Sequence, residues 1–180
     1  MSITLHLRDV AATELLGRSL AIAIEDRIDA VRSNGLQINL TGDLGAGKTA
    51  LVRAVLHRMG VVGPIKSPTF ALLEPYAVSS LDFYHFDFYR LRDASEFATA
   101  GFREHFGPGR ICAVEWPERA AGRLPTADIA ITLTLERDGR RVSISAISEL
   151  GQGCLRQAMA MMQAVDDGSS PSVPARSSSH

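Results

Sequence analysis

The sequence predicts an α/β fold with a mixed, mostly parallel central sheet, and three observations support this prediction. Residues 36–41 alternate apolar and polar side chains, as a strand does, and a glycine-rich stretch follows directly. Apolar residues between positions 51 and 59 then recur at the spacing of one helical face. Residues 111–114 form an uninterrupted apolar run, which is typical of a strand buried in a parallel sheet.

The glycine-rich stretch, residues 42–49, reads GDLGAGKT and matches the phosphate-binding loop pattern GxxxxGK[ST]. Its glycines permit positive φ angles, so that backbone N–H groups turn inward around an anion. A chance match is the alternative, but a strand before the loop and a helix after it are the context that the motif requires. The candidate nucleotide-binding residues of this loop are Gly42, Asp43, Leu44, Gly45, Ala46, Gly47, Lys48 and Thr49. Lys48 would contact the β- and γ-phosphates, and the Thr49 hydroxyl would bind Mg²⁺.

The chain before the loop predicts a short strand over residues 3–7 and one helix over residues 11–32, which Asn34 and Gly35 end. Thr13, near the start of this helix, is either a capping residue or a contact to a bound base. After the loop, residues 70–78 and 81–89 predict a hairpin with a turn at Ser79 and Ser80.

The second strand of this hairpin carries polar groups among aromatic ones. Phe83, His85, Asp87 and Tyr89 share one face, and we expect the opposite face, residues 84, 86 and 88, to be core. The Asp87 carboxylate either forms an ion pair with Arg90 or Arg92, or serves a functional site.

The apolar run at 111–114 ends abruptly at Glu115, after short helical turns over residues 93–104 that break at Gly101. In phosphate-loop proteins an acid at the carboxyl end of a neighbouring strand holds Mg²⁺ or its water, because ligands gather outside those strand ends. The alternative is an ordinary acid at the end of a strand. Trp116, the only tryptophan, either stacks on a base or packs in the core.

The last part of the chain predicts a second hairpin, residues 126–135 and 142–147 around Asp138 and Gly139, followed by an amphipathic helix over residues 150–165. Residues 166–180 are rich in Ser and Pro and have almost nothing to bury, so we expect a disordered tail after a single domain of residues 1–165.

The composition is that of an ordinary globular domain, with 46% hydrophobic and 22% charged residues. A net charge of −1 with scattered arginines argues against electrostatic binding of nucleic acid. Cys112 and Cys154 form no C-x-x-C pair, and no signal-like or membrane-spanning run is present, so we expect reduced thiols, no membrane association and a cytoplasmic location.

Four motifs occur in order along the chain: GDLGAGKT at 42–49, SPTF at 67–70, HFDFYR at 85–90 and EWPE at 115–118. Together they resemble the TsaE (YjeE) family of small bacterial ATPases, over roughly residues 5–155. That family supports formation of threonylcarbamoyladenosine in tRNA, next to the anticodon.

The resemblance implies a P-loop NTPase-like fold with three α/β/α layers, ATP hydrolysis with Mg²⁺, and assembly with the proteins TsaD and TsaB, through which tRNA is reached only indirectly. It implies catalytic roles for Lys48, Asp87 and Glu115, with Thr49, Asp87 and Glu115 as metal ligands. Residues 67–69 and Asp87 would act as switch-like elements, and Trp116 and Thr13 would lie near the nucleotide, Thr13 close to the adenine.

Other classes of nucleotide-binding protein remain to be separated from this one. A guanine-specific GTPase needs an N-K-x-D segment, and neither Lys48 nor Lys66, the only lysines, lies in one. A small-molecule kinase of the same fold needs an arginine-bearing lid, for which Arg137, Arg140 and Arg141 are candidates. A non-catalytic module would use ATP only to hold its loops for a partner. A kinase accelerates ATP loss only with an acceptor, and a module binds without turnover.

Overall fold

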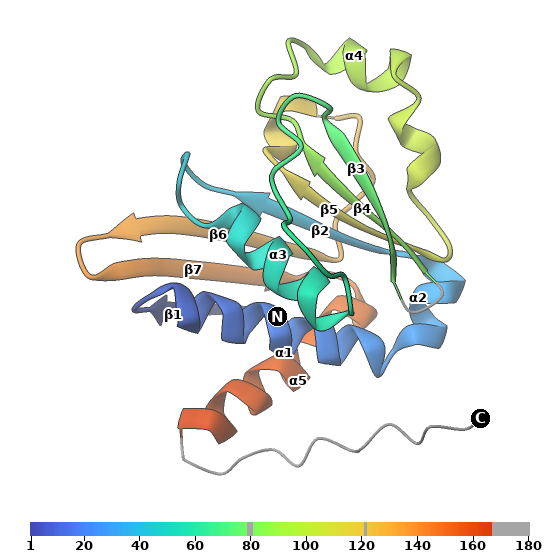
Figure 1. Ribbon diagram of the computed structural model, residues 1–180. Helices are drawn as coiled ribbons and strands as arrows, with labels where there is room; N and C mark the ends of the chain where they lie inside the picture. The colour runs from blue at the N-terminus through green and yellow to red at the C-terminus, as the bar shows by residue number, and fades with distance from the viewer. Residues whose placement is uncertain (79–80, 121, 167–180) are drawn as a thin grey trace.

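The computed structural model describes residues 1–78, 81–120 and 122–166, and within them one mixed sheet has the strand order β1-β7-β6-β2-β5-β4-β3 (Figure 1). The central strands β6, β2, β5 and β4 run parallel, and β1, β7 and β3 pair antiparallel with their neighbours. The strands are β1 (Ser2–Leu7), β2 (Leu36–Thr41), β3 (Leu73–Val78), β4 (Leu81–Asp87), β5 (Arg110–Glu115), β6 (Ile129–Glu136) and β7 (Gly139–Ala146).

Helices cover both faces of this sheet, so the predicted three-layer α/β/α fold is confirmed. On one face α1 packs between α3 and α5 (Figure 1) and closes the larger apolar core over the central strands. The helices are α1 (Val10–Glu25), α2 (Ile28–Asn34), α3 (Lys48–Arg58), α4 (Ala94–Thr99) and α5 (Glu149–Asp166), with single 3-10 turns η1 (Phe102–His105) and η2 (Pro117–Ala120).

The second helical layer is smaller and lies over β4 and β5. An aromatic cluster joins this layer to the sheet: Phe86 and Phe88 of the β4 segment contact Phe97 of α4 and Phe102 of η1, with ring centroids 5.4 to 6.0 Å apart. These edge-to-face and tilted contacts are the arrangements that aromatic quadrupoles favour. The cluster therefore confirms that the even-numbered face of residues 84–88 is core. The opposite face is buried as well, because Phe83 belongs to the larger core.

Two predicted elements were wrong in their extent. The helix expected over residues 11–32 is two helices, because Arg27 leaves helical geometry (φ −119°, ψ 25°) and donates its guanidinium to the Ala23 carbonyl at 3.0 Å and to Gln157 of α5. The strand expected from residue 70 begins only at Leu73. Leu72 has a positive φ of 65°, and its N–H closes a turn onto the Pro68 carbonyl at 2.6 Å.

The remaining predicted elements are present, although the strands expected over residues 81–89, 126–135 and 142–147 span Leu81–Asp87, Ile129–Glu136 and Gly139–Ala146. The strand of residues 36–41, the helix after the loop, both hairpins and the C-terminal helix are all present. The turn at Ser79 and Ser80 and the tail after Asp166 lie outside the described residues. No helix in the described part of the chain is long and apolar enough to cross a membrane.

The parallel strands of the sheet place the functional motifs together. The loop of residues 42–47 leaves the carboxyl end of β2, and the register of β4 against β5 sets Asp87 directly opposite Glu115, each the last residue of its strand. Because carboxyl ends of parallel strands meet at one edge of a sheet, both acids lie next to the loop.

Candidate nucleotide-binding site

A cavity of about 390 Å³ lies where the glycine loop, the first turn of α3 and the ends of β4 and β5 meet. Lys48, Thr49, Asp87, Glu115 and Trp116 all line it. The sheet thus brings together five site residues that the sequence predicts from three separate segments. The volume of the cavity lies in the range of small-molecule binding sites.

The glycine loop needs its glycines at specific points. Gly42 and Gly47 have φ angles of +131° and +108°, which L side chains rarely adopt. A Cβ atom at Gly42 would lie 2.1 Å from the Leu133 carbonyl oxygen, and one at Gly47 would lie 2.0 Å from the Arg140 guanidinium. The loop therefore passes against the β6–β7 hairpin with no room for a side chain at Gly42, whereas at Gly47 the positive φ, rather than the flexible Arg140 side chain, is what favours glycine. Gly47 caps α3 so that the helix starts at the cavity.

Lys48 is buried at the cavity wall, with 4% of its surface exposed. Its ammonium donates to the carbonyls of Gly42 at 2.6 Å and Asp43 at 2.9 Å, and lies 4.1 Å from the centroid of the Trp116 ring. Burial lowers the pKa of Lys48 from its ordinary value, and the negative charges of Glu115 and Asp87 oppose that shift. A phosphate at this point would supply the negative charge that a desolvated ammonium needs.

Thr49 and Glu115 are in direct contact. The Thr49 hydroxyl donates to Glu115 Oε1 at 2.8 Å, and Glu115 is 3% exposed. Since the hydroxyl donates its hydrogen bond to the carboxylate, the lone pairs of Thr49 Oγ1 remain available to a cation. Glu115 is thus buried against the glycine-loop helix rather than in solvent, and its role as a metal ligand stays a prediction.

Asp87 accepts hydrogen bonds from three groups. The hydroxyls of Ser67 and Thr69 both donate to Oδ2, that of Thr69 at 2.8 Å, and the Tyr89 N–H donates to Oδ1 at 2.9 Å. The alternative, an ion pair of Asp87 with Arg90 or Arg92, is not what the structure shows. Arg90 lies over the Phe70 ring at 4.2 Å, and Arg92 faces Glu96 at 4.0 Å. Residues 67–69 are therefore tied to the cavity through one carboxylate.

Trp116 both lines the cavity and packs. Its backbone has a φ of 58°, an uncommon value for a large side chain, and its N–H donates to the Leu40 carbonyl of β2 at 3.2 Å. The Tyr89 ring lies 5.1 Å away. Left-handed backbone at a non-glycine residue costs about 1–3 kcal/mol and gathers at functional sites.

Some predicted residues lie apart from the cavity. Thr13 is fully buried, and its hydroxyl donates to the Asp9 carbonyl at 3.2 Å. Asp9, not Thr13, caps α1, because its carboxylate accepts the Ala12 N–H at 2.8 Å. The capping alternative for Thr13 is wrong, and its contact with adenine stays a prediction. The loop residues that are not part of the cavity lining are Gly42, Asp43 and Ala46.

Two residues near the site were missed. His85 Nε2 donates to Glu115 Oε1 across 2.9 Å, although the sequence marked His85 only as a polar group among aromatics. Arg140 reaches across from β7 to the Ala46 carbonyl at 3.3 Å. The GxxxxGK[ST] pattern carries no signal for a residue on a distant hairpin.

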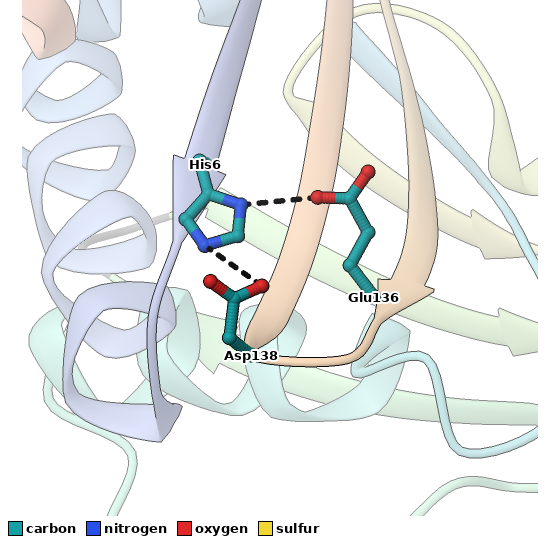
Figure 2. Close-up of side chains that lie close together, drawn as sticks. All are labelled: His6, Glu136 and Asp138. Carbon is teal, nitrogen blue, oxygen red and sulfur yellow. Dashed lines mark hydrogen bonds and ion pairs between the residues drawn. The ribbon is translucent and has the colours of Figure 1, made fainter.

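A second polar cluster lies away from this cavity, where His6 of β1 faces Glu136 and Asp138 of the β6–β7 hairpin (Figure 2). Glu136 Oε2 lies 3.1 Å from Nδ1 of the imidazole, and Asp138 Oδ1 lies 3.8 Å from Nε2. The carboxylates face different ring nitrogens, while a metal ion takes one nitrogen of a histidine. Arg141 also binds Glu136 and lowers the pKa of that carboxyl. We therefore assign no metal ion to this cluster.

The fold and the loop geometry define a P-loop NTPase-like α/β protein. The chain is similar in fold to the crystal structure of YdiB from Bacillus subtilis, with a TM-score of 0.66 and 21% identity over 89% of this chain and 95% of that one.

Residues 7–142 match the family described as "Threonylcarbamoyl adenosine biosynthesis protein TsaE". The TsaE protein of Haemophilus influenzae is 36% identical over 154 residues, which cover 86% of this chain and 96% of that protein. The TsaE protein of Treponema pallidum is 40% identical over 108 residues, covering 59% and 78%. The chain belongs to the TsaE family, which is involved in tRNA threonylcarbamoyladenosine biosynthesis.

Proposed function

We propose that this protein binds Mg-ATP in the cavity beside residues 42–49 and hydrolyses it in support of tRNA threonylcarbamoyladenosine formation. The observation that carries the proposal is the contact of Thr49 with Glu115 at 2.8 Å beside the buried ammonium of Lys48. A hydroxyl, a carboxylate and an ammonium at the start of a glycine-capped helix are the groups that P-loop enzymes use to hold a nucleotide and its cation.

The side chains at the cavity suit magnesium. Thr49, Asp87 and Glu115 offer only oxygen atoms, which are the ligands that Mg²⁺ prefers, and the two acids lie opposite each other in the β4–β5 register. When bound, the cation neutralises charge on the phosphate oxygens. Lys48 would stabilise the negative charge of the transferring phosphoryl group, and Asp87 and Glu115 would hold the cation or its water shell.

Adenine is the expected base. The N-K-x-D segment with which GTPases read guanine does not occur in the sequence, since Lys48 and Lys66 are the only lysines. Competition between ATP and GTP for the site tests this part of the proposal.

A small-molecule kinase is disfavoured by the contacts of its candidate lid arginines. Arg140 is bound to the Ala46 carbonyl behind the loop, and Arg141 forms an ion pair with Glu136 on the surface of the hairpin. None of the three candidates, Arg137 included, lines the cavity. The non-catalytic module is separated from the ATPase by turnover alone.

TsaD and TsaB are the proposed partners, and the rim of the cavity is the proposed surface. Leu44, Phe70 and Tyr89 are exposed by 73%, 85% and 38%, and large apolar groups at a surface favour protein contacts. Because Ser67 and Thr69 are bound to Asp87, a change at the γ-phosphate would move the segment that carries Phe70. A net charge of −1 releases few counterions from a phosphate backbone, so tRNA would be met through the complex.

The experiment measures partner affinity and ATP hydrolysis together. Purified TsaD and TsaB are titrated with this protein in the presence of an ATP analogue, ADP or no nucleotide, and phosphate release is followed in parallel. The proposal expects the ATP analogue to tighten association and the partners to increase turnover. Submicromolar tRNA binding by the isolated protein at physiological salt, with partner affinity indifferent to nucleotide, would contradict the proposed mechanism.

A further inference from the structure

A buried histidine–glutamate pair lies directly beneath the cavity. His85 of β4 is 0% exposed and Glu115 of β5 is 3% exposed, with His85 Nε2 and Glu115 Oε1 2.9 Å apart. An ionised carboxylate only accepts hydrogen bonds, so the imidazole must carry its proton on Nε2 to form this contact. The other ring nitrogen, Nδ1, is buried without a hydrogen-bond partner among the described residues.

Packing alone does not explain a histidine at this position. Phe83, two residues earlier on the same face of β4, is 1% exposed in the apolar core, so this face accepts an aromatic ring without polar atoms. A buried polar pair is often no more stabilising than apolar residues of the same volume, and an unpaired buried nitrogen adds a further cost. Glu115 itself lines the cavity, which relates the pair to the site rather than to the core.

The strand register shows how the imidazole reaches the carboxylate. His85 is paired with Ala113, and Asp87 is paired with Glu115. Side chains two residues apart on a strand share a face, so His85 lies beside Asp87 and diagonally opposite Glu115. The small side chain of Ala113 leaves room for the ring to extend toward Glu115.

Both donors to this carboxylate end on the same oxygen. Thr49 Oγ1 donates to Glu115 Oε1 at 2.8 Å from the glycine-loop side, and His85 Nε2 meets it at 2.9 Å from the strand side. Two donors on Oε1 fix the rotation of the carboxylate and leave Oε2 for a cation or its water.

We propose that His85 is a positioning residue, whose Nε2–H holds Glu115 in the orientation that binds magnesium together with Thr49. This inference rests on the proposed Mg-ATP function. Hydrogen-bonded partners behind a metal ligand change metal affinity or activity by about 10- to 100-fold when they are removed.

The test compares variants that keep or lose a donor at the Nε2 position. H85Q retains an N–H at that distance from the backbone, whereas H85F keeps a ring of similar size without a donor. H85L is a second variant without the donor, so that the result does not depend on the folding of one protein. Y84F, which removes a polar group from the adjacent position on the opposite face, is the matched control.

Two quantities are measured for each variant: affinity for a non-hydrolysable ATP analogue in Mg²⁺ and in EDTA, and the Mg²⁺ concentration for half-maximal ATP turnover. H85F and H85L should lose about 10- to 100-fold of the Mg²⁺-dependent gain in affinity and need more Mg²⁺ for turnover, with affinity in EDTA unchanged. H85Q and Y84F should behave as the wild type. In an E115Q background H85F should have little further effect, because the two residues act as a unit.

The outcomes separate the two claims. A wild-type protein whose nucleotide affinity is the same in Mg²⁺ and in EDTA would contradict the proposed metal site and this inference together. A wild-type protein that depends on Mg²⁺, with H85F and H85L that keep the same dependence, would overturn the role of His85 and leave the proposed function standing. Equal losses in Mg²⁺ and in EDTA, or in H85Q and H85F alike, would also overturn it, since a purely structural role gives that result.

Discussion

Replacement of Lys48 by methionine tests whether Lys48 binds the phosphates of the nucleotide. Lys48 and Lys66 are the only lysines, and of the two only Lys48 lines the cavity, so Lys66 offers a matched control. Methionine keeps the length and apolar stem of the side chain and removes the ammonium. A hydrogen bond to a charged group contributes about 1.5–3 kcal/mol, and 1.4 kcal/mol is a factor of ten. Lys48→Met should therefore weaken ATP binding by about tenfold to 150-fold. Lys66→Met, which changes an exposed side chain, is the control.

The same variant should be about as stable as the wild type without nucleotide. The change removes two hydrogen bonds to the carbonyls of Gly42 and Asp43, but also the cost of burying an ammonium. Because burial lowers the pKa of Lys48 in the folded state, the folded protein holds this proton less tightly than the unfolded chain. That unfavourable contribution fades as pH rises through the lowered pKa toward 10.5, so the stability of the wild type relative to the variant should increase over this range.

The assays are isothermal calorimetry for affinity and thermal unfolding for stability. Calorimetry is needed because the Lys48 ammonium lies 4.1 Å from the only tryptophan ring, so the substitution alters the fluorescence signal itself. Unchanged ATP affinity in Lys48→Met would refute the assignment of Lys48 to the phosphates. An equal loss of affinity in Lys66→Met would show that the loss in Lys48→Met comes from net charge.

Three further predictions concern the acid of β4, the base and the thiols. Asp87→Asn should lower turnover more than nucleotide affinity in steady-state kinetics and calorimetry, because a carboxylate near the cation matters most as charge develops on the phosphoryl group; equal effects on both would make Asp87 a binding residue only. GTP should displace a labelled ATP analogue much less well than ATP does, and equal displacement would remove the argument for adenine. Burial raises the pKa of Cys112 to about 12 and that of Cys154 to about 11, so both thiols stay protonated until the pH approaches those values. Neither should react with a thiol reagent at pH 8 before the protein unfolds, and rapid modification of the folded protein would contradict their burial.

The elements around the glycine loop were predictable because local sequence determines them. Alternation marks β2, glycine ends it, and the apolar stripe after Lys48 marks α3, so β2 agrees with the predicted range at both ends. The break between α1 and α2 was not predictable. Residues 26 and 27 include no glycine or proline, and Arg27 is held by Gln157, a residue 130 positions away.

The candidate site likewise has residues that local sequence identifies and contacts that depend on long-range pairing. A motif and the end of an apolar strand identified Lys48, Thr49 and Glu115, and the cavity brings these three together. The partners of these residues depend on the strand register, which sequence alone does not specify. The contact of His85 with Glu115 requires β4 and β5 to pair with Asp87 opposite Glu115.

The position of Arg140 against the glycine loop requires another long-range pairing. β6 has to lie beside β2 and β7 beside β6 before the hairpin reaches the loop. Likewise, the hydroxyls of Ser67 and Thr69 reach Asp87 only because the loop before β3 folds back over the end of β4. These contacts join segments that are 18 to 94 residues apart.

The most direct test of the central claim is the release of inorganic phosphate from ATP by the wild type and by Glu115→Gln, each in Mg²⁺ and in EDTA and with TsaD and TsaB added. Glu115→Gln keeps the size of the side chain, and its amide oxygen can still accept the hydrogen bond from the Thr49 hydroxyl, so folding should be preserved. Wild-type turnover should require Mg²⁺, and the variant should lose about tenfold or more of it, together with the Mg²⁺-dependent gain in ATP affinity, while its affinity for ATP in EDTA stays that of the wild type. Phosphate release that persists in EDTA, or that is equal in a folded Glu115→Gln protein, would contradict a magnesium-dependent ATPase site at the end of β5.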